Sequence, residues 1–356
     1  VLAPALLALG EERGASGVAV LDAYIAGLEA MLVIGAGVNI AHYEKGWHTT
    51  STIGVIGAAG AAARLLGLDA EGVQRALSLG FSHASGSKLQ FGTMAKPLHA
   101  GMAAKNALMA VRYAKAGLST VDEPLEERWG FRDLYVGFDA SLGYANSADL
   151  LGPPLAIERY GLKVKIHPDC ASTHCAIDGV LALMAEHGLC ADDIDMVETV
   201  VNKISYDNLM FPDPVSEMEA RFSMQYGVAL AITKGALKLA DFRPEAIADE
   251  AVRAWLPRVK MTLSPSDDPL PTVDNGREPA KVFIRTKDGR DFDIFMQRAK
   301  GVLQNPLTDD EIWSKFGDCI EKIIDPAKAD DIRSHLEMFE TLDDIGDLMQ
   351  LLRAGS

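Results

Sequence analysis

Two glycine-flanked turns in the first third of the chain contain the residue types of a small anion site. The first turn places His48 and Thr49 before a run of hydroxyl residues, and the second places Lys96 and His99 on either side of a Pro-Leu pair. Imidazole, ammonium and hydroxyl groups can bind an anion and move a proton. Each turn precedes an Ala/Gly-rich segment that can pack tightly as a helix. This pattern predicts an enzyme with a cationic pocket.

Each turn also has a purely structural interpretation. A histidine next to Trp47 is more often a hydrogen-bonded structural residue than a catalyst, and the hydroxyl run can simply cap the following helix. Lys96 and His99 can equally be two solvated cations. However, Pro97 favours the first turn of a helix, and a lysine there is disfavoured by the helix dipole unless an anion shares the site. The second turn is therefore the more informative one.

A third segment, residues 163–174, contains Lys165 and ends at His174. The His-Pro pair inside it must be extended, and Ser172 or Thr173 can cap a helix that begins near His174. The alternative is a charged linker followed by a capped helix. The functional interpretation is that this segment brings Lys165 from a second domain to the first.

A fourth segment contains Arg221 and Tyr226, which lie on a predicted helix with Phe222 one turn before the tyrosine. Tyr226 can be a core residue with its hydroxyl at the rim, and Arg221 can be half of a salt bridge. This signal is weak by itself.

Composition excludes several classes of protein. The formal net charge of -16 and the pI near 4.9 argue against nucleic-acid binding, which needs a basic face. The four cysteines lack zinc or iron-sulfur spacing, so we expect reduced thiols, no metal site and a cytoplasmic protein. Glu29 and Arg64 interrupt the two most apolar regions, so we expect no membrane span.

The hydrophobic periodicity predicts a mainly α-helical protein with an α+β second domain. Residues 1–160 and 306–356 are expected to form one large all-helical domain, with the C-terminal helices packed on it, and 161–305 a smaller α+β lid domain. More locally, we expect the elements that follow: a strand over 196–204, an exposed loop over 262–280, a β-hairpin around the Asp-Gly pair at 288–289, and an amphipathic helix over 338–348.

Taken in order, these four segments and a tail containing Asn305-Pro306-Leu307-Thr308 and Lys315-Phe316 resemble the MmgE/PrpD family. That family includes 2-methylcitrate dehydratase, cis-aconitate decarboxylase and iminodisuccinate epimerase. The resemblance implies a helical domain interrupted by an α+β lid, a homodimer, and activity on small di- and tricarboxylates without metal or other cofactor. Members of the family carry a further N-terminal segment that supplies another catalytic histidine, and the resemblance implies that this sequence lacks that segment.

The resemblance also implies roles for individual residues. The catalytic residues it implies are His48, Lys96, Lys165 and Tyr226, and the substrate-binding residues are His99, Thr49, Arg221 and His174.

These residue types suit proton removal next to a carboxylate, because lysines and a histidinium stabilise the enolate-like charge that develops there. The first hypothesis is a cofactor-free lyase, a dehydratase of a 2-methylcitrate-like acid. The alternatives are an epimerase or racemase of an iminodiacid, a cis-aconitate-type decarboxylase, and an inactive helical dimer that only binds carboxylates.

Overall fold

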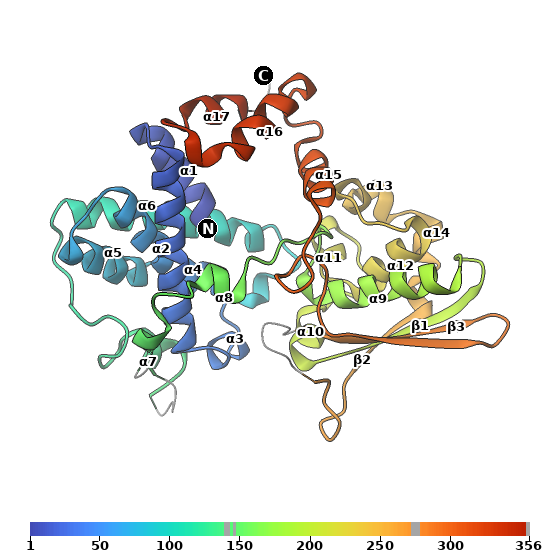
Figure 1. Ribbon diagram of the computed structural model, residues 1–356. Helices are drawn as coiled ribbons and strands as arrows, with labels where there is room; N and C mark the ends of the chain where they lie inside the picture. The colour runs from blue at the N-terminus through green and yellow to red at the C-terminus, as the bar shows by residue number, and fades with distance from the viewer. Residues whose placement is uncertain (139–142, 145–146, 272–277, 354–356) are drawn as a thin grey trace. The chain divides into compact units, whose positions relative to one another are not determined.

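The computed structural model describes residues 1–138, 143–144, 147–271 and 278–353, and these fall into two compact units (Figure 1). Unit 1 comprises residues 1–90, 95–159 and 321 onward, and unit 2 comprises 91–94 and 160–320. The second border between the units lies after residue 320 and not at the expected residue 306, because residues 306–320 belong to unit 2.

The regular secondary structure in the described residues of unit 1 is helical. Its α-helices are α1 (Leu2–Arg13), α2 (Gly17–Ala36), α3 (Ala41–Glu44), α4 (Thr49–Leu65), α5 (Ala70–Ser82), α6 (Ala95–Lys115), α7 (Phe131–Tyr135), α8 (Ala156–Tyr160), α16 (Ala329–Glu337) and α17 (Gly346–Leu351). Short 3-10 turns η1 (Lys88–Gln90), η2 (Ser147–Leu150), η5 (Pro326–Lys328) and η6 (Phe339–Thr341) join them.

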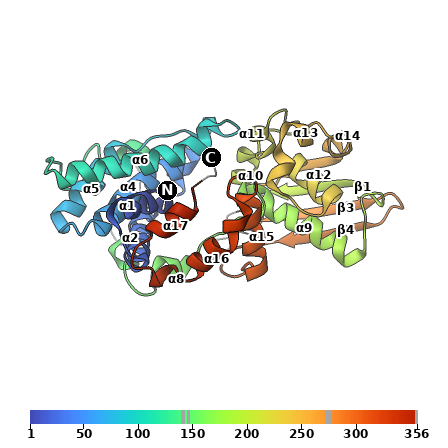
Figure 2. The same cartoon turned by 90° about the horizontal axis from the view of Figure 1, so that it is seen from above.

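Helix α4 is the centre of unit 1. It contacts α1, α2, α5 and α6, and α5 and α6 can be seen beside it in Figure 2. From Ile53 to Ala63 its sequence is all Ala, Gly and aliphatic residues, which lets neighbouring helices approach closely. A Cβ on Gly57 would lie 2.4 Å from Cγ of Met31 on α2, so this crossing requires glycine. The Ala/Gly-rich segment after the first turn is therefore a buried helix, as predicted.

Helix α2 is, in the described part of the chain, the one helix long and apolar enough to cross a membrane by composition. It packs along α4 and α1 within unit 1. The C-terminal helices also belong to this unit, since α17 contacts α1 and η6 contacts α2.

Unit 2 combines a small sheet with helices. Its strands are β1 (Ile194–Val201), β2 (Val259–Leu263), β3 (Ala280–Thr286) and β4 (Asp291–Met296). Its helices are α9 (Ala171–His187), α10 (Lys203–Asn208), α11 (Glu217–Ala220), α12 (Met224–Lys234), α13 (Pro244–Ile247), α14 (Glu250–Arg253) and α15 (Asp309–Ile320), with 3-10 turns η3 (Leu239–Phe242) and η4 (Leu256–Arg258).

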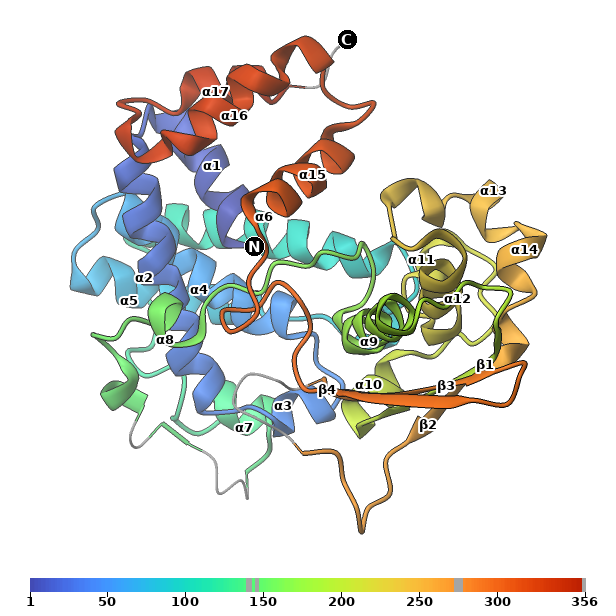
Figure 3. The same cartoon turned by 45° about the vertical axis from the view of Figure 1, so that its right-hand side comes forward.

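The sheet has the strand order β2-β1-β3-β4, with β1 and β2 parallel and the other two pairings antiparallel. Helices α9 and α12 pack against each other and against the sheet (Figure 3). The alternation of buried and exposed residues along β3 places its buried side chains under α9. The structure thus confirms a mainly helical protein with an α+β second part, and it confirms the β3-β4 hairpin.

Three local expectations hold only in part. The strand expected over 196–204 ends at Val201, because the Asn202 side chain accepts a hydrogen bond from the Ser205 backbone amide and starts α10. The loop expected over 262–280 begins inside β2, and its residues 272–277 lie outside the described part. The amphipathic helix expected over 338–348 is broken into η6 and α17, with the non-helical residues 342–345 between them.

Candidate active site

The first turn of the candidate site is held by backbone pairing. Trp47 and Ser87 form an antiparallel bridge, in which the His48 amide donates to the Gly86 carbonyl at 3.0 Å and the Lys88 amide donates to the Gly46 carbonyl at 2.8 Å. The bridge fixes His48 as the residue immediately before α4. No side-chain cap is made at this helix end, so the structure does not support the alternative in which the hydroxyl run caps the helix.

Two histidines meet at this turn. His48 Nδ1 lies 3.0 Å from His99 Nδ1, and His99 is on α6 one turn after Lys96. In a hydrogen bond between two imidazoles, one Nδ1 carries the proton and the other accepts it. The first ring then has a basic Nε2 and the second has an Nε2–H. The pair therefore offers one proton acceptor and one proton donor.

The surroundings keep both rings neutral. Burial, then the charge of Lys96, then His99 lower the pKa of His48 from 6.5 to about 4. Burial and then Lys96 also lower the pKa of His99. Near pH 7 the positive charge of this group thus belongs to Lys96, while the imidazoles are neutral. The structure brings three of the predicted residues together in unit 1.

Gly86 allows this close approach. Its φ is +120°, and a Cβ there would lie 2.9 Å from Cβ and Oγ of Ser51 and 3.2 Å from His99 Nδ1. Any side chain at this position would therefore push against the histidine pair.

A second buried histidine, His42, stabilises the first turn, and the sequence-based predictions missed it. His42 Nε2 lies 2.9 Å from Thr52 Oγ1, and the same hydroxyl lies 3.3 Å from the His48 carbonyl. The His42 ring stacks on Phe131 and Tyr135, and burial lowers its pKa from 6.5 to about 4. The sequence offered one signal for His42: it lies in the same turn, six residues before His48.

Thr49 lines a cavity whose described lining residues include neither His48 nor His99. The cavity is largely apolar, has a volume of about 400 Å³ and lies at the start of α4, where Thr50 and residues of α1 and α2 also line it. The role of Thr49 in substrate binding stays a prediction.

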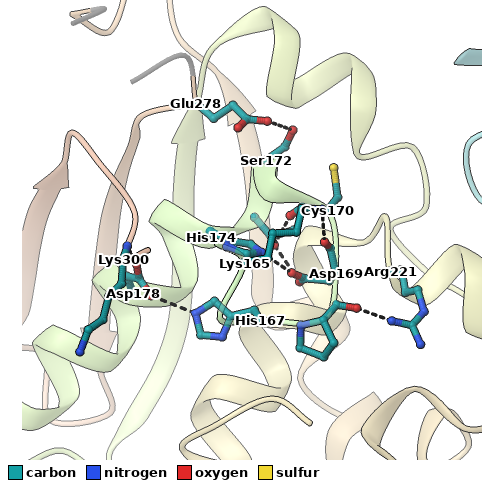
Figure 4. Close-up of polar contacts among 12 residues, drawn as sticks. Lys165, His167, Asp169, Cys170, Ser172, His174, Asp178, Arg221, Glu278 and Lys300 are labelled. Carbon is teal, nitrogen blue, oxygen red and sulfur yellow. Dashed lines mark hydrogen bonds and ion pairs between the residues drawn. The ribbon is translucent and has the colours of Figure 1, made fainter. Parts of the chain in front are cut away.

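In unit 2, the loop that contains Lys165 is held at several points (Figure 4). Lys165 Nζ donates to the Asp169 carbonyl at 2.8 Å, the Cys170 amide donates to the Arg221 carbonyl at 2.8 Å, and the Arg221 guanidinium donates to the Pro168 carbonyl. The cap expected at Ser172 or Thr173 is not formed, because α9 begins at Ala171 with Cys170 as its N-cap. The loop is thus rigidly joined to the start of α9.

Two carboxylate–histidine pairs lie under this loop. Asp169 Oδ1 is 3.0 Å from His174 Nε2, and Asp178 Oδ1 is 2.9 Å from His167 Nε2. Burial alone would raise the pKa of Asp169, but the hydrogen bond and charge of His174, with smaller effects of His167, hold it below its ordinary value. His174 was predicted to bind substrate, yet its side chain is fully buried against Asp169.

Arg221 and Tyr226 have structural contacts. Arg221 forms an ion pair with Glu217 at 2.7 Å besides its bond to the loop. Tyr226 is fully buried in the core of unit 2, and its hydroxyl donates to the Asp241 carbonyl at 2.5 Å. Burial, then the charge of Asp241, raise its pKa. These contacts match the salt-bridge and core interpretations, and functional roles for both residues stay predictions.

The predicted residues thus fall into two groups. His48, Lys96 and His99 form one group in unit 1, and Lys165 lies in unit 2 on a loop held by Arg221. Within the described ranges, no set of three or more His, Cys, Asp or Glu side chains is arranged to hold a metal ion.

Two family models match separate parts of the chain. The model of the MmgE/PrpD N-terminal domain matches residues 1–141, and that of the MmgE/PrpD C-terminal domain matches residues 167–341. The chain belongs to the MmgE/PrpD family. Together the two models match most of the sequence. The first covers His48, Lys96 and His99, and the second covers Arg221 but begins two residues after Lys165.

The chain is similar to several cis-aconitate decarboxylases. It is 28% identical to the human enzyme over 93% of this chain and 70% of that protein, and 27% identical to the mouse enzyme over 93% and 69%. It is 23% identical to the cis-aconitate decarboxylase of Aspergillus terreus over 99% and 75%. These relatives support a lyase-type function at the level of the family.

Proposed function

We propose that this MmgE/PrpD protein is a lyase that acts on a small di- or tricarboxylate without a cofactor. The observation that carries the proposal is the neutral histidine pair, His48 and His99, next to the charge of Lys96. Such a group can bind a carboxylate through the ammonium and exchange a proton through the imidazoles.

The first candidate reaction is decarboxylation of a cis-aconitate-like acid, and the similarity to three cis-aconitate decarboxylases supports it. In this reaction the bond from carbon to the departing carboxylate breaks and CO2 leaves. The electron pair stays on the substrate as an allylic, enolate-like anion, which Lys96 stabilises. The Nε2–H of one histidine then protonates the carbon.

The second candidate is dehydration of a 2-methylcitrate-like hydroxy acid, and the complementary protonation of the two imidazoles favours it. One Nε2 can take the proton next to a carboxylate while the other Nε2–H protonates the departing hydroxyl, so that an alkene and water form. In both reactions, a bound polycarboxylate would offset the charge of Lys96 and raise the pKa of His48 toward its ordinary value.

We assign proton transfer to His48 and His99 and carboxylate binding to Lys96 and Lys165. The homodimer and the cytoplasmic location stay predictions.

The test is to incubate the protein separately with cis-aconitate, 2-methylcitrate and iminodisuccinate in deuterated water and follow each by NMR. A decarboxylated product supports the first candidate and an alkene with released water supports the second. Deuterium exchange without loss of CO2 or water would replace both with an epimerase. Binding without any reaction would leave only a carboxylate-binding protein, and the proposal would be wrong.

A further inference from the structure

Asp169 has two acceptor groups that point in different directions (Figure 4). Its neutral backbone carbonyl accepts from Lys165 Nζ at 2.8 Å. Its carboxylate is turned into the protein, where Oδ1 lies 3.0 Å from His174 Nε2 and Oδ2 accepts from Thr173 Oγ1 at 2.7 Å. The nearest acidic residue in the loop therefore orients Lys165 without pairing its negative charge with the ammonium.

The carboxylate is held by a rigid part of unit 2. Thr173 and His174 are in the first turn of α9, and this helix packs on α12 and on the sheet. The side chains of Asp169 and His174 are both fully buried. A buried carboxylate that has lost its solvation depends on such partners, so it cannot turn outward while they are present.

The arrangement matters for a lysine that binds an anion. Among the described residues, the Lys165 ammonium has one hydrogen-bond partner, the Asp169 carbonyl. An ammonium has three donors, so two remain for a ligand. If the Asp169 carboxylate rotated toward Lys165, the resulting ion pair would compete with a substrate carboxylate for the same charge.

We propose that Asp169 and His174 are positioning residues for Lys165. Their buried pair fixes the Asp169 carbonyl that aims the ammonium, and it keeps the Asp169 carboxylate away from the ammonium. This inference rests on the proposed function, since it takes Lys165 as a residue that binds the substrate carboxylate. It also explains why His174 is informative in the sequence although it is too deeply buried to touch a ligand.

The test is a double-mutant cycle in the whole chain. His174→Met, Lys165→Met and the double variant are compared with the wild type in two measurements. One is kcat/KM on the acid that the NMR test identifies as the substrate, and the other is the calorimetric affinity for citrate as a probe. We expect His174→Met to lower both by about tenfold, because Asp169 would lose its contact with His174 and its carboxylate could turn toward Lys165. In the Lys165→Met background we expect His174→Met to have no further effect, because it acts through Lys165.

Conservative variants separate positioning from folding. His174→Gln keeps an N–H donor for Asp169 and should retain near wild-type affinity. Thr173→Val and Asp169→Asn each remove part of the contact with little change of volume and should lower affinity in the same direction, even if His174→Met does not fold. Asp241→Asn removes a partly buried carboxylate that pairs with Lys234 at 2.6 Å in the same unit, and should leave affinity unchanged.

Equal losses from His174→Met with and without Lys165 would overturn the inference, as would unchanged affinity in both Thr173→Val and Asp169→Asn. If the wild-type protein neither binds the probe nor turns over any acid, the proposed function itself fails. If the wild-type protein is active and only the cycle is additive, the proposed function stands and this inference alone is wrong.

Discussion

Two buried neutral histidines should make unit 1 sensitive to acid. The pKa values of His42 and His48 are about 4 in the folded protein, against an ordinary value of 6.5. Well above pH 6.5 both rings are neutral whether the chain is folded or not. As the pH falls from 6.5 toward 4, the unfolded chain takes up protons that the folded chain does not, so the free energy of unfolding falls. Below about pH 4 both states are protonated and this effect levels off.

The size follows from the two pKa values. For one histidine, the loss between pH 7.5 and pH 5 is about 2 kcal/mol, and for two independent histidines about 4 kcal/mol. His42→Gln removes one titrating ring. Its free energy of unfolding should therefore fall by about 2 kcal/mol less than that of the wild type over the same pH range. Because each variant is compared with itself at the two pH values, any destabilisation that does not depend on pH cancels from the difference in its free energy of unfolding.

Amide hydrogen exchange in α4 is a suitable measurement, because it reports the opening of unit 1 without assuming that the whole chain unfolds in one step. His42→Phe provides the control. It loses the hydrogen bond to Thr52 that glutamine can keep, so it differs in stability, yet it should show the same reduced pH dependence. A wild-type pH dependence in both variants would refute the assignment of a depressed pKa to His42.

Three further predictions concern other parts of the chain. Lys96→Met should raise the pKa of His48, since the lysine charge helps to lower it; NMR titration of the imidazole would show no change if the two groups do not interact. Gly17→Ala should detach the C-terminal helices from α2, because its Cβ would lie 1.6 Å from the Phe339 carbonyl oxygen; resistance of this segment to protease would contradict that contact. Tyr226→Phe should lower the free energy of unfolding by about 1 kcal/mol and leave kcat unchanged if the tyrosine is structural, whereas a large loss of kcat would support the catalytic role predicted for it.

The sequence predicted those elements whose signals are local. The Asp288-Gly289 pair predicted the β3-β4 hairpin, because the turn and both strands lie within a short stretch. Strand β2 was missed because it is short and pairs with β1 more than sixty positions earlier in the chain, through contacts that no local pattern encodes. The break in the expected helix over 338–348 likewise depends on tertiary contacts, such as the Gly17 amide bonding the Leu342 carbonyl.

The candidate site shows the same distinction. Spacing alone indicated that Lys96 and His99 share one turn of a helix, and the structure has both in α6. The direction of a buried side chain could not be predicted. His174 lies five residues after Asp169, but only the fold shows that it faces this carboxylate rather than a ligand.

The most direct test of the account is the turnover of cis-aconitate by the wild-type protein and by His48→Asn, followed by NMR in deuterated water. Asparagine can keep a hydrogen bond to His99 but cannot exchange a proton as an imidazole does. The account predicts that the wild type releases CO2 and leaves one deuterium on the product, and that His48→Asn is slower by about 10² to 10⁴-fold. Turnover by His48→Asn at the wild-type rate would contradict the central role of the histidine pair.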